Sequence, residues 1–288
     1  MKKIFIILGA VGYNRGSEAL TRGLVNICKQ TSIDSQIYLS SNEQNLNKIC
    51  KIPCIHKIIN KYTNIFFIHI ISAFFKKILL LKTLSVKIKS STLLKYAKKM
   101  DLIIIIGADN YDKSYGMTNT LYNLNKTLKK VSKAKMLLYD VSLDKSHIDK
   151  HTINDFNMFN HITVREHETL NNLKNLLPIN KISYYPDPAF TMKPEECTIQ
   201  NYIQTDNTVG INLSPLITRK CYNAKPQIIL NAYFKLIDFI IKNTDMSVVL
   251  IPHVMNGEDL SILRMIYNKY TNDTGRLKIV DNEDLTAP

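Results

Sequence analysis

The sequence predicts an α/β fold with two domains, each built on a parallel sheet covered by helices. Short apolar runs typical of buried strands alternate with longer segments in which apolar residues recur at helical spacing. The alternation stops once, in a polar stretch near residues 195–207, and then resumes. The chain has 288 residues and is 45% hydrophobic, which suffices for two cores. We therefore predict an N-terminal domain at residues 1–195 and a second domain at residues 205–288.

The N-terminal domain begins with the apolar run 4–8, which is followed by a loop and a helix over residues 17–30. Its remaining strands and helices follow from the same alternation of patterns. Strands are expected at 35–39, 102–106, 135–139, 161–165 and 182–185, and helices at 66–81, 118–131, 148–157 and 166–177.

The second domain contains fewer elements than the first. Strands are expected at 208–213, 247–251 and 277–280, and helices at 226–242 and 258–270. A domain with three strands and two helices is small for a doubly wound α/β domain. We therefore expect the second domain to be incomplete in this chain.

The loop after the first strand contains Gly9, Gly12 and Gly16 and runs into a helix start. Such a loop offers bare backbone N–H groups and a partial positive charge to an anion. It is neither a G-x-G-x-x-G fingerprint nor a P-loop, so a ligand loop and a tight turn both stay open. Asn14 suits a sugar hydroxyl or a phosphate, or only a left-handed turn. Glu18 suits the first helical turn electrostatically even without a functional role.

Positive charge is concentrated in one segment of the chain. The net charge is +14, and residues 44–100 contain twelve lysines and no Asp or Glu. Within this segment the apolar run 65–75 is too short to span a bilayer, which takes about 20 residues. A buried helix with solvated lysines and a basic surface lying on anionic lipid both stay open. The second alternative would use Lys76, Lys77, Lys82 and Lys87. The aromatic residues do not interleave with the lysines, so nucleic acid is not expected.

The cysteines indicate a reducing compartment. There are five, an odd number, scattered along the chain, and no secretory signal precedes them. Cys50, Cys54 and His56 lack the spacing of a zinc site. We expect a cytoplasmic protein without a metal.

Two polar residues follow predicted strands at the edge where open α/β sheets bind ligands. Arg165 ends the strand 161–165, and its planar fork suits a carboxylate or a phosphate. Pairing with Glu166 or Glu168 is an equal alternative. His253 follows the strand 247–251 and titrates in the range useful for acid–base catalysis, or it is a loop histidine without a task.

Further candidates follow other strands. Asp109 and Asn110 come after the strand 102–106, where they could bind sugar hydroxyls, act as a base or cap a turn. Asp187 lies between two prolines and could bind substrate or fix an interdomain turn. Asp140 and Ser142, after the strand 135–139, are weaker candidates.

Six segments have distinctive sequence motifs. They are GAVGYNRGSEAL (9–20), DLIIIIGADN (101–110), ITVREHETL (162–170), YYPDPAF (184–190), VGINLSP (209–215) and IPHVMNGED (251–259). Together they resemble, in the same order, the motifs of the polysaccharide pyruvyl transferase family. The chain departs from the family at Ser17, where Asp is common, and at Ala108 and Asp109, which replace glycines.

The resemblance implies two Rossmann-like domains in a GT-B-like arrangement. The family's Arg-x-His segment would follow the point where this sequence ends, so we expect either a fragment or truncated product, or a protein that has lost that part. It implies a transferase that moves a pyruvyl group from phosphoenolpyruvate to a sugar of a cell-surface polysaccharide or its lipid-linked precursor, forming a ketal. No metal or organic cofactor is expected. The candidate catalytic residues are His253, Asp109 and Glu18, and the candidate substrate-binding residues are Gly12, Asn14, Gly16, Asn110, Arg165 and Asp187.

Two other functions stay open. A nucleotide-sugar glycosyltransferase of GT-B type would also use glycine loops and edge carboxylates. The chain could also be a truncated, inactive relative that binds a membrane surface or a partner. In the leading interpretation the enzyme works in the cytoplasm, at the inner face of the membrane.

Overall fold

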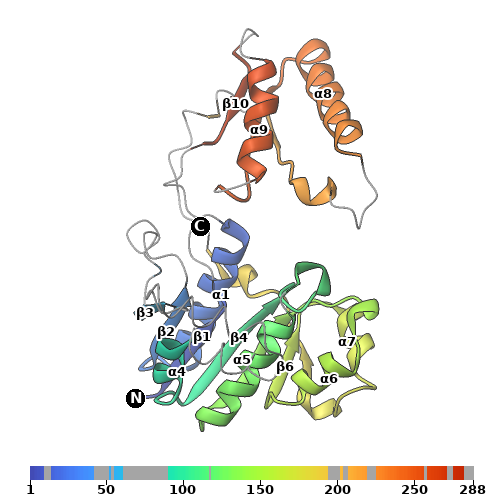
Figure 1. Cartoon of the computed structure of the whole chain (residues 1–288). Helices are drawn as coiled ribbons and strands as arrows, with labels where there is room; N and C mark the ends of the chain where they lie inside the picture. The colour runs from blue at the N-terminus through green and yellow to red at the C-terminus, as the bar shows by residue number, and fades with distance from the viewer. Residues whose placement is uncertain are drawn as a thin grey trace, which may run out of the picture. The chain divides into compact units, whose positions relative to one another are not determined.

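The computed structural model divides the chain into two compact units, which are described separately (Figure 1). Unit 1 holds the N-terminal strand and Ser17–Met192, and unit 2 holds Asn14, Arg15 and Gly16 together with the chain from Lys193. The structure describes residues 1–9, 14–41, 52, 55–60, 90–116, 118–193, 202–203, 207–218, 225–255, 258–270 and 275–281.

Unit 1 is built on a parallel sheet of seven strands in the part of the chain that the structure describes, in the order β3-β2-β1-β4-β5-β6-β7. The strands are β1 (Lys3–Ile7), β2 (Gln36–Ser41), β3 (Ile55–Asn60), β4 (Leu102–Ala108), β5 (Lys135–Val141), β6 (His161–Val164) and β7 (Ile182–Tyr184). The helices are α1 (Arg15–Thr31), α4 (Ser91–Ala97), α5 (Thr118–Val131), α6 (Lys150–Phe156) and α7 (His167–Leu173), with 3-10 turns η3 (Lys113–Tyr115), η4 (Lys145–His147), η5 (Ile179–Lys181) and η6 (Pro188–Thr191).

Helices cover both faces of this sheet because its central strands are apolar on both faces. Successive strand residues point to opposite sides, so β1 and β4 contribute to two separate cores. One core contains Phe5, Ile7, Ile103 and Ile105 with Leu121, Leu124 and Leu128 of α5. The other contains Ile4, Ile6, Ile104 and Ile106 with Leu24 and Val25 of α1.

The strand order places a topological switch point beside β1. The chain builds the sheet outward from β1 to β3, and then returns to add β4 on the other side of β1. In open α/β sheets, ligands bind outside the carboxyl ends of the strands near such a point. The polar residues that follow β4, β5, β6 and β7 therefore lie along the edge where a site is expected.

Unit 2 contains a smaller parallel sheet in the order β10-β9-β8 (Figure 1). Its strands are β8 (Thr208–Ile211), β9 (Ser247–Leu250) and β10 (Leu277–Ile279), and its helices are α8 (Pro226–Asn243) and α9 (Glu258–Lys269), with the 3-10 turn η7 (Pro215–Thr218). Ile237, Val248, Leu250, Leu263 and Ile266 form the centre of its core. The Arg276 guanidinium donates hydrogen bonds to the carbonyls of Ile241 and Thr244 at the C-terminal end of α8. Carbonyls at the end of a helix have no donor within the helix itself, so Arg276 caps this end.

Most of the predicted elements are present with shifts of one or two residues at their ends. Sequence reasoning missed β3 and α4, which flank the centre of the lysine-rich segment. The predicted helix 66–81 lies outside the described residues, and so do Lys76, Lys77, Lys82 and Lys87. Among the helices that the structure describes, none combines the length and the apolar character needed to cross a membrane.

Candidate functional site

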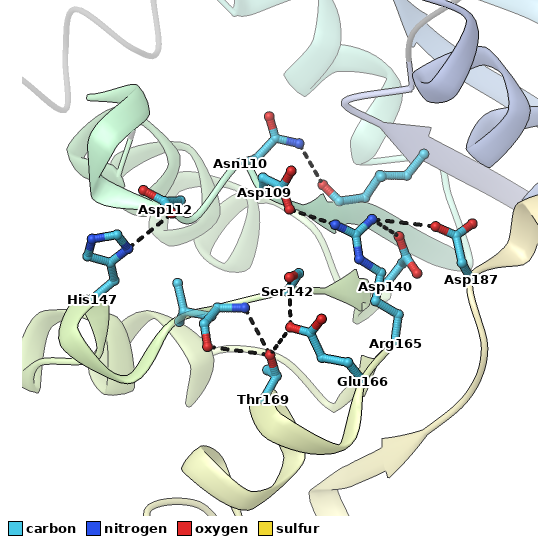
Figure 2. A network of polar contacts seen from close by, with 12 residues as sticks. Asp109, Asn110, Asp112, Asp140, Ser142, His147, Arg165, Glu166, Thr169 and Asp187 are labelled. Atoms are coloured by element: carbon cyan, nitrogen blue, oxygen red, sulfur yellow. Dashed lines mark hydrogen bonds and ion pairs between the residues drawn. The ribbon is translucent and has the colours of Figure 1, made fainter. Parts of the chain in front are cut away.

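A cluster of charged side chains lies at the carboxyl ends of four neighbouring strands of unit 1 (Figure 2). Arg165, directly after β6, is its centre. The Arg165 Nη2 atom lies 2.6 Å from Oδ1 of Asp109, after β4. Its Nη1 atom lies 3.4 Å from Oδ2 of Asp140, near the end of β5, and 3.4 Å from Oδ2 of Asp187, after β7. Three of the predicted site residues thus meet in one cluster, which Asp140 joins.

A β-bulge directs Asp140 to this cluster. The register between β5 and β6 jumps from Leu138 to Val141, and the intervening Asp140 has a φ of 67°. Its backbone N–H donates to Oγ1 of Thr163 at 2.9 Å instead of joining the ladder. Bulges commonly re-aim a side chain next to a functional site. Asp adopts the left-handed conformation at a lower conformational free-energy cost than most residues, so the bulge is compatible with an Asp at this position.

The turn that carries Asp187 is fixed from both sides. Oδ1 of Asp187 accepts a hydrogen bond from the Ala189 backbone N–H at 2.8 Å, which leaves Oδ2 for Arg165. The following turn, η6, packs directly on α1 at Gly23. A Cβ atom at Gly23 would lie 1.9 Å from the Pro188 carbonyl oxygen, so only glycine fits there. The Asp-Pro turn is therefore held against a helix of the same unit.

The charges of the cluster are unequal, because one guanidinium faces three carboxylates. The Asp140 side chain is 1% exposed, and its Oδ1 has no hydrogen-bond partner among the described residues. Burial, followed by the negative charge of Asp187, raises the pKa of Asp140 to about 7, although the Arg165 charge opposes this. A carboxyl group with this pKa can gain or lose a proton at neutral pH.

Glu166, the residue after Arg165, has a different role. Its Oε1 accepts hydrogen bonds from Oγ of Ser142 at 2.7 Å and from Oγ1 of Thr169 at 2.6 Å (Figure 2). Burial favours a raised pKa, but these two hydroxyl donors and the Arg165 charge outweigh it and lower the pKa of Glu166. Glu166 therefore stays ionised and ties the end of β5 to the start of α7.

Two other predicted residues of unit 1 have local partners. Nδ2 of Asn110 donates to the Ile106 carbonyl at 3.3 Å, so the side chain turns back on its own strand. Glu18 is fully buried in α1, where Oε1 accepts from Nε of Arg22 at 2.7 Å. Neither contact tests a role in catalysis or binding, and those roles stay predictions.

The remaining predicted residues belong to unit 2. Asn14 forms an isolated antiparallel bridge with Val254, and the Arg15 N–H donates to the His253 carbonyl at 3.2 Å. The His253 side chain is exposed. Buried Asp259 fixes this loop by accepting from the Val254 N–H at 3.1 Å. Gly16 is exposed, and Gly12 lies outside the described residues.

No cluster of metal-binding side chains is present among the residues that the structure describes. The sequence profile of the polysaccharide pyruvyl transferase family matches residues 14–283, nearly the whole chain. The chain belongs to this family. This match confirms the resemblance that the six sequence segments indicated. The family is a family of transferases. No curated protein sequence matches the chain significantly.

Solved structures resemble this pyruvyl transferase family member in fold. One is the complex of Staphylococcus aureus MnaA with UDP, at 13% identity and a TM-score of 0.59, covering 99% of this chain and 69% of that one. Another is a putative UDP-N-acetylglucosamine 2-epimerase from Listeria monocytogenes, at 10% identity and a TM-score of 0.58, covering 99% and 70%. The UDP-GlcNAc 2-epimerase of Methanocaldococcus jannaschii has 14% identity and a TM-score of 0.52, covering 97% and 73%. At these identities the likeness confirms the predicted α/β class of Rossmann-like, GT-B-type units and nothing more.

The structure brings Asp140, a weaker candidate from the sequence, into the cluster around Arg165. Its signal was a lone carboxylate inside the apolar run of β5, KMLLYDV. A charged group buried in such a run destabilises the fold unless it is paired or its pKa shifts. A carboxylate at this position therefore indicates an ion pair or a shifted pKa. What the sequence could not reveal is the bulge, because it depends on how β5 pairs with β6.

Proposed function

We propose that this chain transfers a pyruvyl group from phosphoenolpyruvate to a sugar of a cell-surface polysaccharide or of its lipid-linked precursor. Family membership supports pyruvyl transfer. The observation that carries the proposal is the Arg165 cluster, where a cation and a carboxyl group of near-neutral pKa meet at the ligand-binding edge of the sheet.

The reaction makes three demands on the site. Two hydroxyl oxygens of the sugar form bonds to C2 of phosphoenolpyruvate, and the bond from C2 to the phosphate oxygen breaks. Of the two hydroxyl protons, one ends on C3 as part of the new methyl group and the other leaves with inorganic phosphate. The site must therefore supply an acid for C3, a base for the hydroxyls and positive charge for the donor's carboxylate and phosphate.

The Arg165 cluster supplies such groups. Arg165 holds the carboxylate or the phosphate of the donor, because its guanidinium forms bidentate contacts with either group. Asp140 exchanges a proton with the reactants near neutral pH. His253 is the second candidate for proton transfer, and Asp109 and Asn110 are candidates for contacts with sugar hydroxyls. Glu18 is a weaker candidate for catalysis, because its side chain is buried and paired with Arg22.

An anionic donor must overcome the negative charge already present around Arg165. Asp109 is the carboxylate most easily replaced, since its side chain is 53% exposed whereas that of Asp140 is 1% exposed. Protonation of Asp140 removes a second negative charge. We therefore expect the donor to displace Asp109 from Arg165 and to raise the pKa of Asp140 when it binds.

Thermal-shift titration tests the choice of donor. A ligand that binds only the folded chain raises its apparent stability by mass action. The proposal predicts a shift with phosphoenolpyruvate that is larger than the shift with inorganic phosphate and is lost in Arg165→Ala. The matched control is Arg264→Ala, which removes an exposed arginine of α9. A shift with UDP alone would favour the nucleotide-sugar glycosyltransferase, and no shift with any ligand would favour an inactive relative.

We further propose that the chain works in the cytoplasm at the inner membrane face, using Lys76, Lys77, Lys82 and Lys87. Their charge and the neighbouring apolar run are the support for this. Changing all four to Glu should abolish sedimentation with anionic vesicles. The control changes Lys2, Lys129, Lys130 and Lys133, four exposed lysines of unit 1, to Glu. Equal loss in both variants would show a net-charge effect and contradict a dedicated surface.

A further inference from the structure

Unit 1 has a pocket of about 440 Å³ that lies apart from the Arg165 ion pairs. It is lined by residues of the connection that follows β4 and by residues of α6, which follows β5. The polar and aromatic side chains of its lining include those of Lys113, Asn119, Tyr122, Asp149, His151 and Asp155. Its volume falls within the range of small-molecule pockets, about 300–1,000 Å³.

Polar contacts join the two walls of this pocket. Nζ of Lys113 lies 2.8 Å from Oδ2 of Asp149, and Nε2 of His151 lies 3.0 Å from Oδ1 of Asn119. A third contact joins the same two connections, with Nδ1 of His147 lying 3.1 Å from Oδ2 of Asp112 (Figure 2). The pocket is therefore a built feature, with side chains already held in place before a ligand arrives.

A buried polar network supports one side of the pocket. Asp155 is 3% exposed, and its Oδ1 accepts a hydrogen bond from Nδ2 of Asn125 at 2.8 Å. The same Nδ2 atom donates to the hydroxyl of Tyr111 at 2.9 Å. Tyr111 in turn packs edge-on against Phe156, with ring centroids 5.3 Å apart. Buried polar groups destabilise a fold unless they are hydrogen-bonded, and these three are joined through Nδ2 of Asn125, while Oδ1 of Asn125 has no hydrogen-bond partner among the described residues.

The lining chemistry excludes some ligands and favours others. Asp149 and Asp155 supply two carboxyl groups against the single ammonium of Lys113, so the pocket has no surplus positive charge for a phosphate. Tyr122 presents an aromatic ring, which His151 meets edge-on at 4.3 Å between centroids. An aromatic ring beside amide, carboxylate and ammonium groups matches a pyranose, which has C–H groups on its faces and hydroxyls at its rim.

We propose that this pocket binds one pyranose ring of the acceptor saccharide, an inference that rests on the proposed pyruvyl transfer. The connection after β4 carries both Asp109 and Lys113, and the chain after β5 runs from Asp140 to Asp149. The pocket and the Arg165 cluster are thus built on the same two strand ends. Tyr122 packs against a face of the ring, the Asn119 amide donates a hydrogen bond to a hydroxyl oxygen, and the Asp149 carboxylate accepts one from a hydroxyl.

The absence of tryptophan from the sequence provides a direct test. The variant Tyr122→Trp places the chain's single indole in the pocket and keeps an aromatic ring there. Its fluorescence is followed while methyl β-galactoside, methyl β-glucoside and methyl β-mannoside are added without any donor. Phe239→Trp, at a position 60% exposed on α8, is the matched control. Circular dichroism checks that each variant is folded.

The proposal predicts a saturable fluorescence change with at least one glycoside in Tyr122→Trp and none in Phe239→Trp. Adding Asp149→Asn or Asn119→Ala to Tyr122→Trp should weaken the apparent affinity, by about tenfold for the charged group. A folded Tyr122→Trp variant that responds to none of the three glycosides would overturn the proposal. So would a response to phosphoenolpyruvate or inorganic phosphate instead.

This experiment separates the pocket from the proposed reaction. Sugar binding without any stabilisation by phosphoenolpyruvate would uphold the pocket and contradict pyruvyl transfer. Stabilisation by phosphoenolpyruvate with no sugar response would uphold the donor and contradict the pocket. In wild-type enzyme with turnover, the pocket predicts that Asp149→Asn raises KM for the acceptor and leaves KM for the donor unchanged.

Discussion

Among the described residues of unit 1, Arg22 and Arg165 each pair with a buried carboxyl group, but Arg165 also meets two partly exposed ones. Arg22 and Glu18 lie one helical turn apart in α1, with 2.7 Å between Nη2 and Oε1. Arg165 instead meets Asp109, Asp140 and Asp187, which come from three other strand ends. The first pair balances its charges within one helix, whereas the second cluster keeps an excess of negative charge.

The difference predicts that the Arg22 pair serves the fold and that the Arg165 cluster suits chemistry. A balanced buried pair is costly to break, because the remaining charge has no partner. An unbalanced cluster has a carboxyl group whose pKa must rise, and here that group also adopts a left-handed backbone in a bulge. Strained backbone and perturbed pKa values gather at functional sites. The comparison therefore predicts large stability effects at Glu18 and pH-dependent effects at Asp140.

The largest stability loss is expected for Glu18→Ala. This variant leaves the Arg22 guanidinium buried without its ion-pair partner, which typically lowers the free energy of unfolding by about 3–5 kcal/mol. Denaturant unfolding monitored by circular dichroism measures it. The control is Glu168→Ala, which removes an exposed glutamate from the first turn of α7. Equal losses in the two variants would contradict a structural role for the buried pair.

The next effect is a change in the pH dependence of stability in Asp140→Asn. The folded pKa of about 7 exceeds the ordinary value of 3.8, so between these pH values the folded chain holds a proton that the unfolded chain has lost. The wild-type free energy of unfolding therefore falls by about 1.4 kcal/mol per pH unit across that window because of Asp140. Asn cannot titrate, and it tolerates the left-handed backbone.

We expect Asp140→Asn to match the wild type near pH 4 and to exceed it increasingly up to pH 7, by as much as about 4 kcal/mol. Burial also raises the pKa of Asp155 to about 7, but Asp155 is present in both proteins and cancels in the difference. Urea unfolding of both proteins at a series of pH values measures this difference. Parallel stability curves across the whole range would show that Asp140 has an ordinary pKa.

A smaller loss is expected for Gly23→Ala, which tests how the Asp187 turn is held. The new Cβ atom would meet the Pro188 carbonyl, so η6 must move, at a cost of about 1–3 kcal/mol. Gly16→Ala in the same helix is the control, since its nearest contact would be 3.5 Å away. Moving Asp187 from Arg165 also lowers the pKa of Asp140. Unfolding of the two variants measures the cost, and equal stability would exclude the close packing.

The smallest effect is expected for Asp109→Asn. Its side chain is 53% exposed, and exposed ion pairs contribute less than about 1 kcal/mol. The variant should be nearly as stable as the wild type but should lower the pKa of Asp140, because the Asp109 charge helps to raise it. Thermal unfolding and an NMR titration measure the two quantities. A loss as large as that of Glu18→Ala would place Asp109 among the structural pairs.

The sequence sufficed for the central strands β1 and β4 because they are almost wholly apolar. IFII in β1 and LIIII in β4 cannot be placed on a half-solvated sheet, so helices on both faces follow. The strand β3 was missed because His56 and Lys57 interrupt its apolar pattern. The helix α4 was also missed, although α6 and α7 have the same length of seven residues and were predicted. Both β3 and α4 lie where lysines dominate the composition.

Within the candidate site, the sequence predicted Arg165 and Asp109 at one edge, because parallel strands bring their carboxyl ends together, whereas Asp187 was interpreted as a substrate contact or an interdomain turn. Asp140 was only a weaker candidate from the sequence, and the bulge that directs it to the cluster arises from pairing between β5 and β6. The pocket beside Tyr122 and His151 was not foreseen for a related reason. It depends on contacts between two connections that lie far apart in sequence, as the pair Lys113 and Asp149 illustrates.

The most direct test of the Arg165 cluster is an NMR titration of the aspartate carboxyl carbons, with Asp140 assigned by comparison with Asp140→Asn. The account predicts that Asp140 titrates near pH 7 in the free chain. It predicts that phosphoenolpyruvate raises this pKa further, because the donor adds negative charge beside it, and that UDP does not. An Asp140 that titrates near its ordinary value, or that responds to UDP but not to phosphoenolpyruvate, would contradict the account.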